Sequence, residues 1–255
     1  MKLLKKIAKI TLSLYLVCGI AWCVFYAASL SLSHIPTVDE ISDFDNVALS
    51  LPPTERNTVR RSRKSAVQVL SLSHSGMIAQ SSGTYIKHGD RYFIFTVAHG
   101  LVGPCDVTKA WTPEGGLVDC IGMPAYDPAV DYAIMEITEI STRTPIDIRQ
   151  SLPSPSQWKA ALASQTKVYY TGYPNGTGPL TVPGTIVGYD STDYIYIHSY
   201  AFGGASGSGV FTADGKLIGY LLAIDVGTTD FGIQALESVV IVVPAFKVDW
   251  TSILK

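Results

Sequence analysis

Short β-rich segments separated by turn signals fill the chain from Ala66 to Pro244, and they limit its fold more than any other feature. Valine, isoleucine, tyrosine and phenylalanine dominate them, as in AVQVLSL, YAIMEI, VYYTGY and SVVIVV. HGD and ADGK lie where hairpin turns are expected, since glycine supplies the positive φ of such turns. Helical patterns are scarce and short: a turn after His99, residues 155–164, and a segment after Pro244. Many short strands predict an all-β barrel or sandwich.

Composition excludes several classes of protein. The chain has 255 residues, of which 47% are hydrophobic and 16% charged, so its bulk is not intrinsically disordered. A formal net charge of -2 gives no overall reason to expect a nucleic-acid partner, although a local basic patch would be compatible with it. The sequence has no CxxC or HExxH motif, so we expect no metal site and no cofactor.

The N-terminal part of the chain resembles a membrane anchor. Residues 1–9 carry four lysines, and residues 10–32 are uncharged and long enough to cross a hydrocarbon layer of about 30 Å as a helix. We therefore predict a transmembrane signal-anchor over 10–32. The alternatives are a cleaved signal peptide, for which Ala27-Ala28-Ser29 offers small residues, and a buried core helix.

The charges on either side of this segment predict its orientation. Lysines precede it, and Asp39, Glu40, Asp43 and Asp45 follow with no Lys or Arg before Arg56. By the positive-inside rule residues 1–9 are then cytoplasmic and the rest of the chain faces outward, or is secreted if the segment is cleaved.

Residues 33–65 are interpreted as a linker. They contain three prolines and a basic run, RNTVRRSRKS, with no sustained apolar periodicity. The alternatives for the basic run are a proteolytic processing site or a patch for anionic lipid or nucleic acid, and no aromatic residue interleaves with it to support nucleic acid.

Three motifs carry residue types suited to nucleophilic catalysis. His99 ends TVAHG after a strand, Asp131 opens the buried-looking strand DYAIMEI, and Ser206 lies in the glycine-rich turn GGASGSGVF. A nucleophilic serine needs a base, a group that orients the base, and backbone N–H donors for the oxyanion. Each motif alone is more often an ordinary turn or strand end. Together they follow the order His, Asp, Ser, with spacings of 32 and 75 residues.

These three boxes resemble those of chymotrypsin-fold, trypsin-like serine proteases, closest to the high-temperature-requirement family and the glutamyl endopeptidases. SSGTYI, TGYP and IVVP resemble further strands of that fold, so the likeness covers about residues 66–250. It implies a protease domain over 66–255 with two six-stranded antiparallel barrels and a C-terminal helix. It also implies a nucleophile at Ser206, a general base at His99, an orienting carboxylate at Asp131, and oxyanion donors at the N–H groups of Gly204 and Ser206.

Neighbouring residues offer weaker candidates for the same roles. Ser208 also lies between glycines, but the G-x-S-G pattern fits Gly204 to Gly207 and favours Ser206. Asp127 precedes a proline and is better suited to a turn. The remaining histidines, among them His74 and His88, have no motif around them.

The resemblance also indicates a substrate pocket and its preference. Its lining would comprise Tyr200, Ala201, Phe202, Leu221, Leu222 and Ala223. No fixed charge lies among these residues, so we expect a small or apolar side chain before the cleaved bond rather than a basic or acidic one.

Two cysteines of the outward-facing part have a spacing suited to a disulfide. Bridging Cys105 to Cys120 would close a loop of about 15 residues in an oxidising compartment. The alternative is two separate buried thiols.

The leading hypothesis is a membrane-anchored serine endopeptidase that acts on polypeptides without a cofactor. The alternatives are a catalytically silent protease-like domain that binds peptides or forms part of an envelope or virion, and an esterase with the same chemistry. The sequence gives no basis for an oligomeric state.

Overall fold

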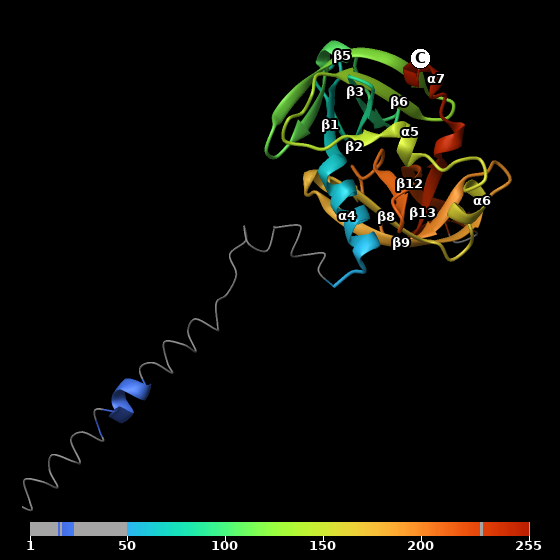
Figure 1. Cartoon of the computed structure of the whole chain (residues 1–255). Helices are drawn as coiled ribbons and strands as arrows, with labels where there is room; N and C mark the ends of the chain where they lie inside the picture. Colours follow the sequence, from blue (N-terminus) through green and yellow to red (C-terminus); the bar gives the residue numbers. More distant parts are fainter. Residues whose placement is uncertain (1–14, 16, 23–49, 230–231, 255) are drawn as a thin grey trace, which may run out of the picture. The chain divides into compact units, whose positions relative to one another are not determined.

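Strands β1 to β6 close into a barrel, with the order β1-β4-β5-β6-β3-β2 and a further β1–β2 pairing that completes the ring. These pairings are antiparallel, and the short strand β7 joins β2 in parallel. In Figure 1 this is the upper barrel. Its strands are β1 Ala66–Leu72, β2 Ile78–His88, β3 Arg91–Thr96, β4 Thr108–Thr112, β5 Gly116–Asp127, β6 Tyr132–Ile137 and β7 Ile146–Asp147.

The remaining strands form a second closed barrel in the order β10-β13-β12-β11-β8-β9, again antiparallel throughout. Its strands are β8 Lys167–Gly172, β9 Leu180–Tyr189, β10 Ile195–His198, β11 Gly209–Thr212, β12 Leu217–Thr229 and β13 Gly232–Pro244. The prediction of two six-stranded antiparallel barrels is therefore confirmed, as are the hairpin turns at HGD and ADGK.

This computed structural model describes residues 15, 17–22, 50–229 and 232–254, and it describes residues 223–229 and 232–237 as backbone only. The predicted segment 1–9 lies outside the described residues, and of the predicted segment 10–32 only residues 15 and 17–22 are described. No helix among those that are described is long and apolar enough to span a membrane.

Over residues 50–229 and 232–254 the helices are few, and those after α4 are short, as the sequence predicts. They are α4 Pro53–Ser65, α5 Ile148–Ser151, α6 Trp158–Ala161 and α7 Thr251–Leu254, with 3-10 turns η1 Cys105–Val107, η2 Pro174–Gly176 and η3 Ala245–Lys247. The helix expected over 155–164 is thus confined to α6, and the predicted C-terminal helix corresponds to η3 and α7.

Each barrel has its own apolar interior. Tyr85 and Met135 belong to the cluster inside the first barrel, and Tyr170 and Ile197 to the cluster inside the second. Along β3 the side chains alternate between two buried faces, because Ile94 points into the barrel while its neighbours face the other way. Both faces of this strand are therefore covered, which explains its continuous apolar run.

A third cluster joins the two barrels. Phe95 of β3 packs against Tyr220 of β12, with ring centroids 4.9 Å apart, and against Trp250 near the C-terminus, at 5.0 Å. Phe95 and Tyr220 are fully buried. This aromatic layer fixes the barrels against each other, and it lies beneath the chain segments that carry the candidate site.

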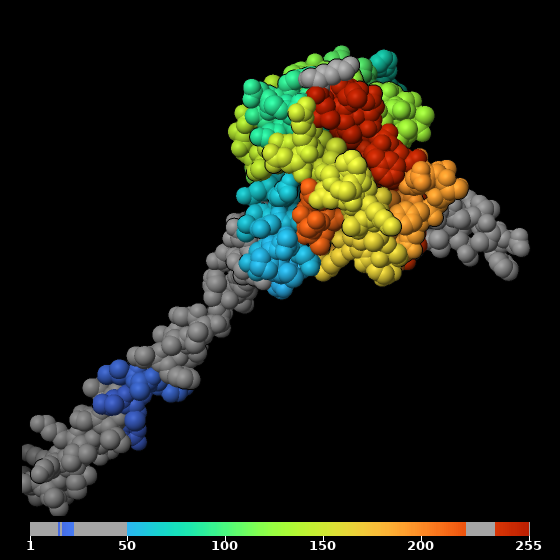
Figure 2. Space-filling model, turned by 45° about the vertical axis from the view of Figure 1, so that its right-hand side comes forward, coloured from blue at the N-terminus to red at the C-terminus, as the bar shows by residue number. Residues whose placement is uncertain are grey.

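The structure corrects the linker interpretation of 33–65, because its last part forms helix α4. Val59 packs against Tyr169 of β8, and the Ser62 hydroxyl donates to that of Thr171 at 2.8 Å. The buried face consists of small and polar residues at helical spacing, so it leaves little trace in an apolar pattern. Figure 2 shows α4 on the surface beside the segment that contains α5, where Arg61 donates to Ser151 at 3.0 Å.

Cys105 and Cys120 form a disulfide bond, which is the pairing expected from the sequence. It joins η1 to β5 and closes the loop that follows His99. A cross-link over such a loop stabilises the folded protein mainly by limiting the unfolded chain.

The contact of α4 with β8 predicts the effect of shortening Val59. Val59→Ala should lower the free energy of unfolding by about 1.5 kcal/mol, because about two buried methylene equivalents are lost. Urea denaturation of the folded unit measures this change. Asn57→Ala, on the exposed face of the same helix, is the control and should change stability little. Equal effects of the two substitutions would contradict the packing of α4.

Candidate active site

The register of β3 and β6 brings His99 and Asp131 together. Thr96 pairs with Ala133 in this antiparallel ladder, so the residues that follow β3 lie opposite those that precede β6. The Ala98 N–H donates to the Asp131 carbonyl at 3.2 Å, which continues the pairing beyond the strands. Two residues 32 positions apart in the sequence thereby become neighbours.

The Asp131 carboxylate binds His99 through both oxygens. Oδ1 accepts the His99 backbone N–H at 2.7 Å, and Oδ2 lies 2.5 Å from the ring Nδ1. A carboxylate only accepts hydrogen bonds, so Nδ1 carries the proton, and in the neutral imidazole Nε2 then presents a lone pair. The His99 side chain is 51% exposed and that of Asp131 only 20%, so the imidazole ring remains accessible while the carboxylate is shielded.

The backbone beneath the carboxylate is held in a left-handed conformation. Asp131 has a φ of 66°, which aspartate tolerates better than most residues. The preceding carbonyl, that of Val130, accepts a hydrogen bond from the Tyr220 hydroxyl at 2.8 Å. Burial raises the pKa of Tyr220, and the charge of Asp131 raises it further, so this hydroxyl stays protonated and remains a donor.

Ser206 lies in the loop between β10 and β11, at the junction of the barrels. Its carbonyl accepts the Ser82 backbone N–H from β2 at 2.8 Å. The next residue, Gly207, lies against the Ser82 carbonyl and the Thr96 hydroxyl, and Thr96 is three residues before His99. The structure thus brings the serine loop to the strands that position His99, and Ser206 itself is half-buried.

Two neighbouring candidates have structural roles instead. The Ser208 side chain is fully buried, and its hydroxyl donates to the Ala205 carbonyl at 2.7 Å. One oxygen of Asp127 accepts the N–H groups of Ala129 and Val130, which makes Asp127 the turn residue that the sequence predicts.

The peptide groups that carry the expected oxyanion donors are anchored by their carbonyl oxygens. The Gly203 carbonyl accepts the Asn175 N–H at 2.7 Å, and the Ala205 carbonyl accepts from Ser208. In a trans peptide the N–H points opposite to the C=O, so these anchors set the directions of the Gly204 and Ser206 N–H groups. Neither N–H donates to another group in the part of the chain that the structure describes.

The residues expected to line the substrate pocket separate into several environments. Tyr200 and Phe202 are exposed, while Ala201 between them is buried. Leu221 is expected from the sequence to line the pocket, whereas the structure packs it inside the second barrel, with 1% of its surface exposed. Leu222 points the other way and is half-buried, because side chains alternate along β12.

The side chain of Ala223 lies outside the described residues.

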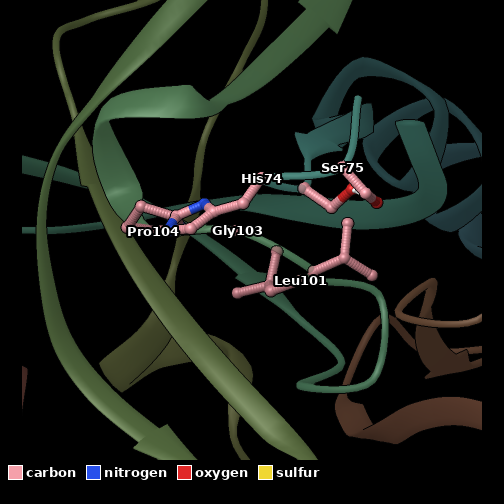
Figure 3. A pocket seen from close by; sticks show the side chains of 7 residues that line it. His74, Ser75, Leu101, Gly103 and Pro104 are labelled. Atoms are coloured by element: carbon pink, nitrogen blue, oxygen red, sulfur yellow. Dashed lines mark hydrogen bonds between the residues drawn. The ribbon is translucent and has the colours of Figure 1, made fainter. Parts of the chain in front are cut away.

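A crevice beside the loop that follows His99 is lined by Ser73, His74 and Ser75 on one side and by residues 101–104 on the other, as Figure 3 shows. No cluster of His, Cys, Asp or Glu among the described residues could hold a metal ion.

Sequence reasoning missed Ser82, Asn175 and Tyr220, which support the site without carrying its chemistry. Ser82 lies in the SSG segment before the histidine box, and a serine within a strand was its only signal. The partners of these residues are distant in the sequence, so spacing alone could not reveal them.

Two closed antiparallel barrels with a histidine–carboxylate pair at their junction define the chymotrypsin-fold class of serine peptidases. The sequence model of the family described as "trypsin-like peptidase domain" matches residues 81–219. The chain therefore belongs to the trypsin-like peptidase family, which confirms the resemblance to chymotrypsin-fold, trypsin-like proteases.

Solved structures with the same fold include three bacterial-type proteases. The serine endoprotease from Yersinia pestis is 17% identical, with a TM-score of 0.59 over 78% of this chain and 65% of that one. The Rv3671c protease from M. tuberculosis, in its active form, is 19% identical, with a TM-score of 0.57 over 76% of this chain and 83% of that one.

The HtrA-type protease AlgW with a tripeptide is 18% identical, with a TM-score of 0.57 over 76% of this chain and 61% of that one. This chain thus spans less than two thirds of the first and the third of these proteins. No curated protein matches the chain by sequence.

The conformation of the serine loop predicts the effect of a methyl group at Gly207. Its φ is +90°, and an added Cβ would lie 2.1 Å from the Ser82 carbonyl oxygen. Gly207→Ala should therefore lower the free energy of unfolding by about 3 kcal/mol. Gly203→Ala in the same loop is the control, because the nearest atom to its Cβ would be 3.7 Å away. Urea denaturation compares the two, and equal stability would refute the steric argument.

Proposed function

We propose that this protein is a serine endopeptidase in which Ser206 is the nucleophile, His99 the general base and Asp131 the carboxylate that orients it. The observation that carries the proposal is the pair of hydrogen bonds that the backbone N–H and ring Nδ1 of His99 donate to the Asp131 carboxylate. Membership of the trypsin-like peptidase family supports it.

Acyl transfer would follow from the tautomer of His99 that Asp131 favours, with the proton on Nδ1. Nε2 of His99 takes the proton of the Ser206 hydroxyl as its oxygen bonds to the substrate carbonyl carbon. The carbonyl oxygen becomes an oxyanion, for which the N–H groups of Gly204 and Ser206 are the proposed donors. His99 then returns the proton to the leaving amine, and the C–N bond breaks to give an acyl-enzyme.

Water then completes the reaction by the same route. His99 removes a proton from the water molecule as its oxygen attacks the acyl carbon, and the proton passes to the Ser206 oxygen as the ester bond breaks. The products are a peptide with a new carboxyl group and the regenerated serine. No step needs a metal or an organic cofactor.

A small or apolar substrate side chain is the proposed preference. The exposed residues Tyr200 and Phe202 and the half-buried Leu222 offer apolar surface without a charge. A desolvated basic or acidic side chain would need a fixed partner of opposite charge, and none lies among these residues.

Labelling with a fluorophosphonate probe tests the nucleophile. Wild-type protein should be labelled, and Ser206→Ala should abolish the signal because it removes the attacking oxygen. Asp131→Asn should slow labelling on the order of 10⁴-fold, since an amide no longer enforces the productive tautomer. Ser156→Ala, in an exposed turn before α6, is the control and should label like wild type. An unlabelled wild type would favour the catalytically silent alternative.

We also propose that residues 10–32 anchor the protein in a membrane, with residues 1–9 in the cytoplasm and the folded unit outside. The uncharged segment and the lysines before it support this arrangement. Full-length protein should stay in membranes after alkaline carbonate extraction, and deletion of residues 1–32 should release it. Recovery of the full-length chain in the supernatant would contradict an anchor, and a mature protein shortened by about 28 residues would indicate a cleaved signal.

A further inference from the structure

Ser82 connects the first barrel to the loop that carries Ser206 through its hydroxyl and its backbone N–H. Its side chain is fully buried on β2. The hydroxyl donates to the Gly204 carbonyl at 2.7 Å and accepts the Tyr173 N–H at 2.8 Å. Its backbone N–H donates to the Ser206 carbonyl at 2.8 Å, and its carbonyl accepts the Thr96 hydroxyl at 2.7 Å. One residue thus holds the loop at two points.

These bonds complete a set of anchors over four successive carbonyls. Ser82 holds the carbonyls of Gly204 and Ser206, while those of Gly203 and Ala205 are held by Asn175 and Ser208. Each peptide plane from Gly203 to Ser206 therefore has a fixed orientation. The Gly204 and Ser206 N–H groups belong to two of these planes, and Ser82 fixes the planes that follow each of them.

The Gly204–Ala205 peptide is held on both sides, because the Ala205 N–H also donates to the Phe202 carbonyl at 3.0 Å. Gly204 has a φ of +90° and no Cβ, so rotation about its backbone bonds meets less steric resistance than at other residues. Ser82 therefore acts on the Gly204 N–H, which lies in the preceding peptide, through the Gly204 backbone. The hydroxyl accepts from the Tyr173 N–H and donates to the Gly204 carbonyl through one oxygen, so an apolar residue at position 82 would remove both bonds.

We propose that Ser82 is a positioning residue for the oxyanion donors: its hydroxyl holds the Gly204–Ala205 peptide, which lies between the two peptides that carry the Gly204 and Ser206 N–H groups, so that both N–H groups converge on the developing negative charge. This inference rests on the proposed function, since it assigns Ser82 a part in acyl transfer by Ser206. Ser82 acts through the loop and does not touch the reacting atoms.

The test compares Ser82→Ala with wild type in the hydrolysis of p-nitrophenyl acetate. We expect kcat to fall about 10- to 100-fold, somewhat less than the loss usually caused by removing an oxyanion donor outright. KM should change less than about twofold, because ground-state binding is not altered. The acidic limb of the pH–rate profile should not move, since the His99–Asp131 pair is left intact.

Thr84→Val is the matched control. Thr84 lies on the same face of β2, is buried, and accepts the Gly209 N–H of the second barrel at 2.8 Å. This substitution also removes a buried hydrogen bond between the barrels, but it leaves the four anchored carbonyls untouched. It should lower the melting temperature about as much as Ser82→Ala while kcat stays close to the wild-type value.

Ser82→Thr retains a hydroxyl and should recover most of kcat. If Ser82→Ala does not fold, Ser82→Cys provides a side chain of similar size with a weaker hydrogen bond, and a reduced kcat is again expected. The inference is overturned if the Ala or Cys variant keeps the kcat of Thr84→Val. Failure of the proposed function gives a different result, in which wild type and Ser206→Ala hydrolyse the ester equally, and the role of Ser82 then falls with it.

Discussion

The contact between one carboxylate and one histidine organises the candidate site. Asp131 binds both the backbone and the ring of His99, so it fixes the position of the residue and the tautomer of its side chain at once. This arrangement depends on the β3–β6 register, because a shift by one residue would exchange the faces on which the side chains lie. The pairing of the buried strands β3 and β6 therefore sets the geometry of the site.

The sequence was informative where chemistry and local structure coincide. The motifs around His99, Asp131 and Ser206 each lie at a strand end or a glycine turn, so residue type, position and order were readable together. Strand-forming composition and turn residues likewise predicted an all-β fold, whereas the two barrels were implied by the resemblance to chymotrypsin-fold proteases. The basic composition of α4 hid its contact face, because helical packing through serine, threonine and a single valine produces no apolar periodicity.

Features that depend on tertiary contacts were not readable in the same way. Leu221 and Leu222 are identical residues in adjacent positions, yet they face different clusters, and only the register of β12 decides which one is buried in the barrel. The contacts of Ser82 were equally unreadable from the sequence, since its partners Tyr173 and Gly204 come from distant parts of the chain. A local pattern in one sequence does not show which distant segments come into contact.

Helix α4 also connects the two halves of the fold. Ser65, its last residue, is followed directly by β1 of the first barrel, whereas its side chains bind the second: Thr58 donates to the Ala213 carbonyl and Arg63 to the Thr181 hydroxyl. The helix thus links the first barrel to the second. A recombinant fragment trimmed to start at Ala66 would include every strand but lose these contacts, so the structural boundary of the folded unit lies before the helix rather than at the first strand.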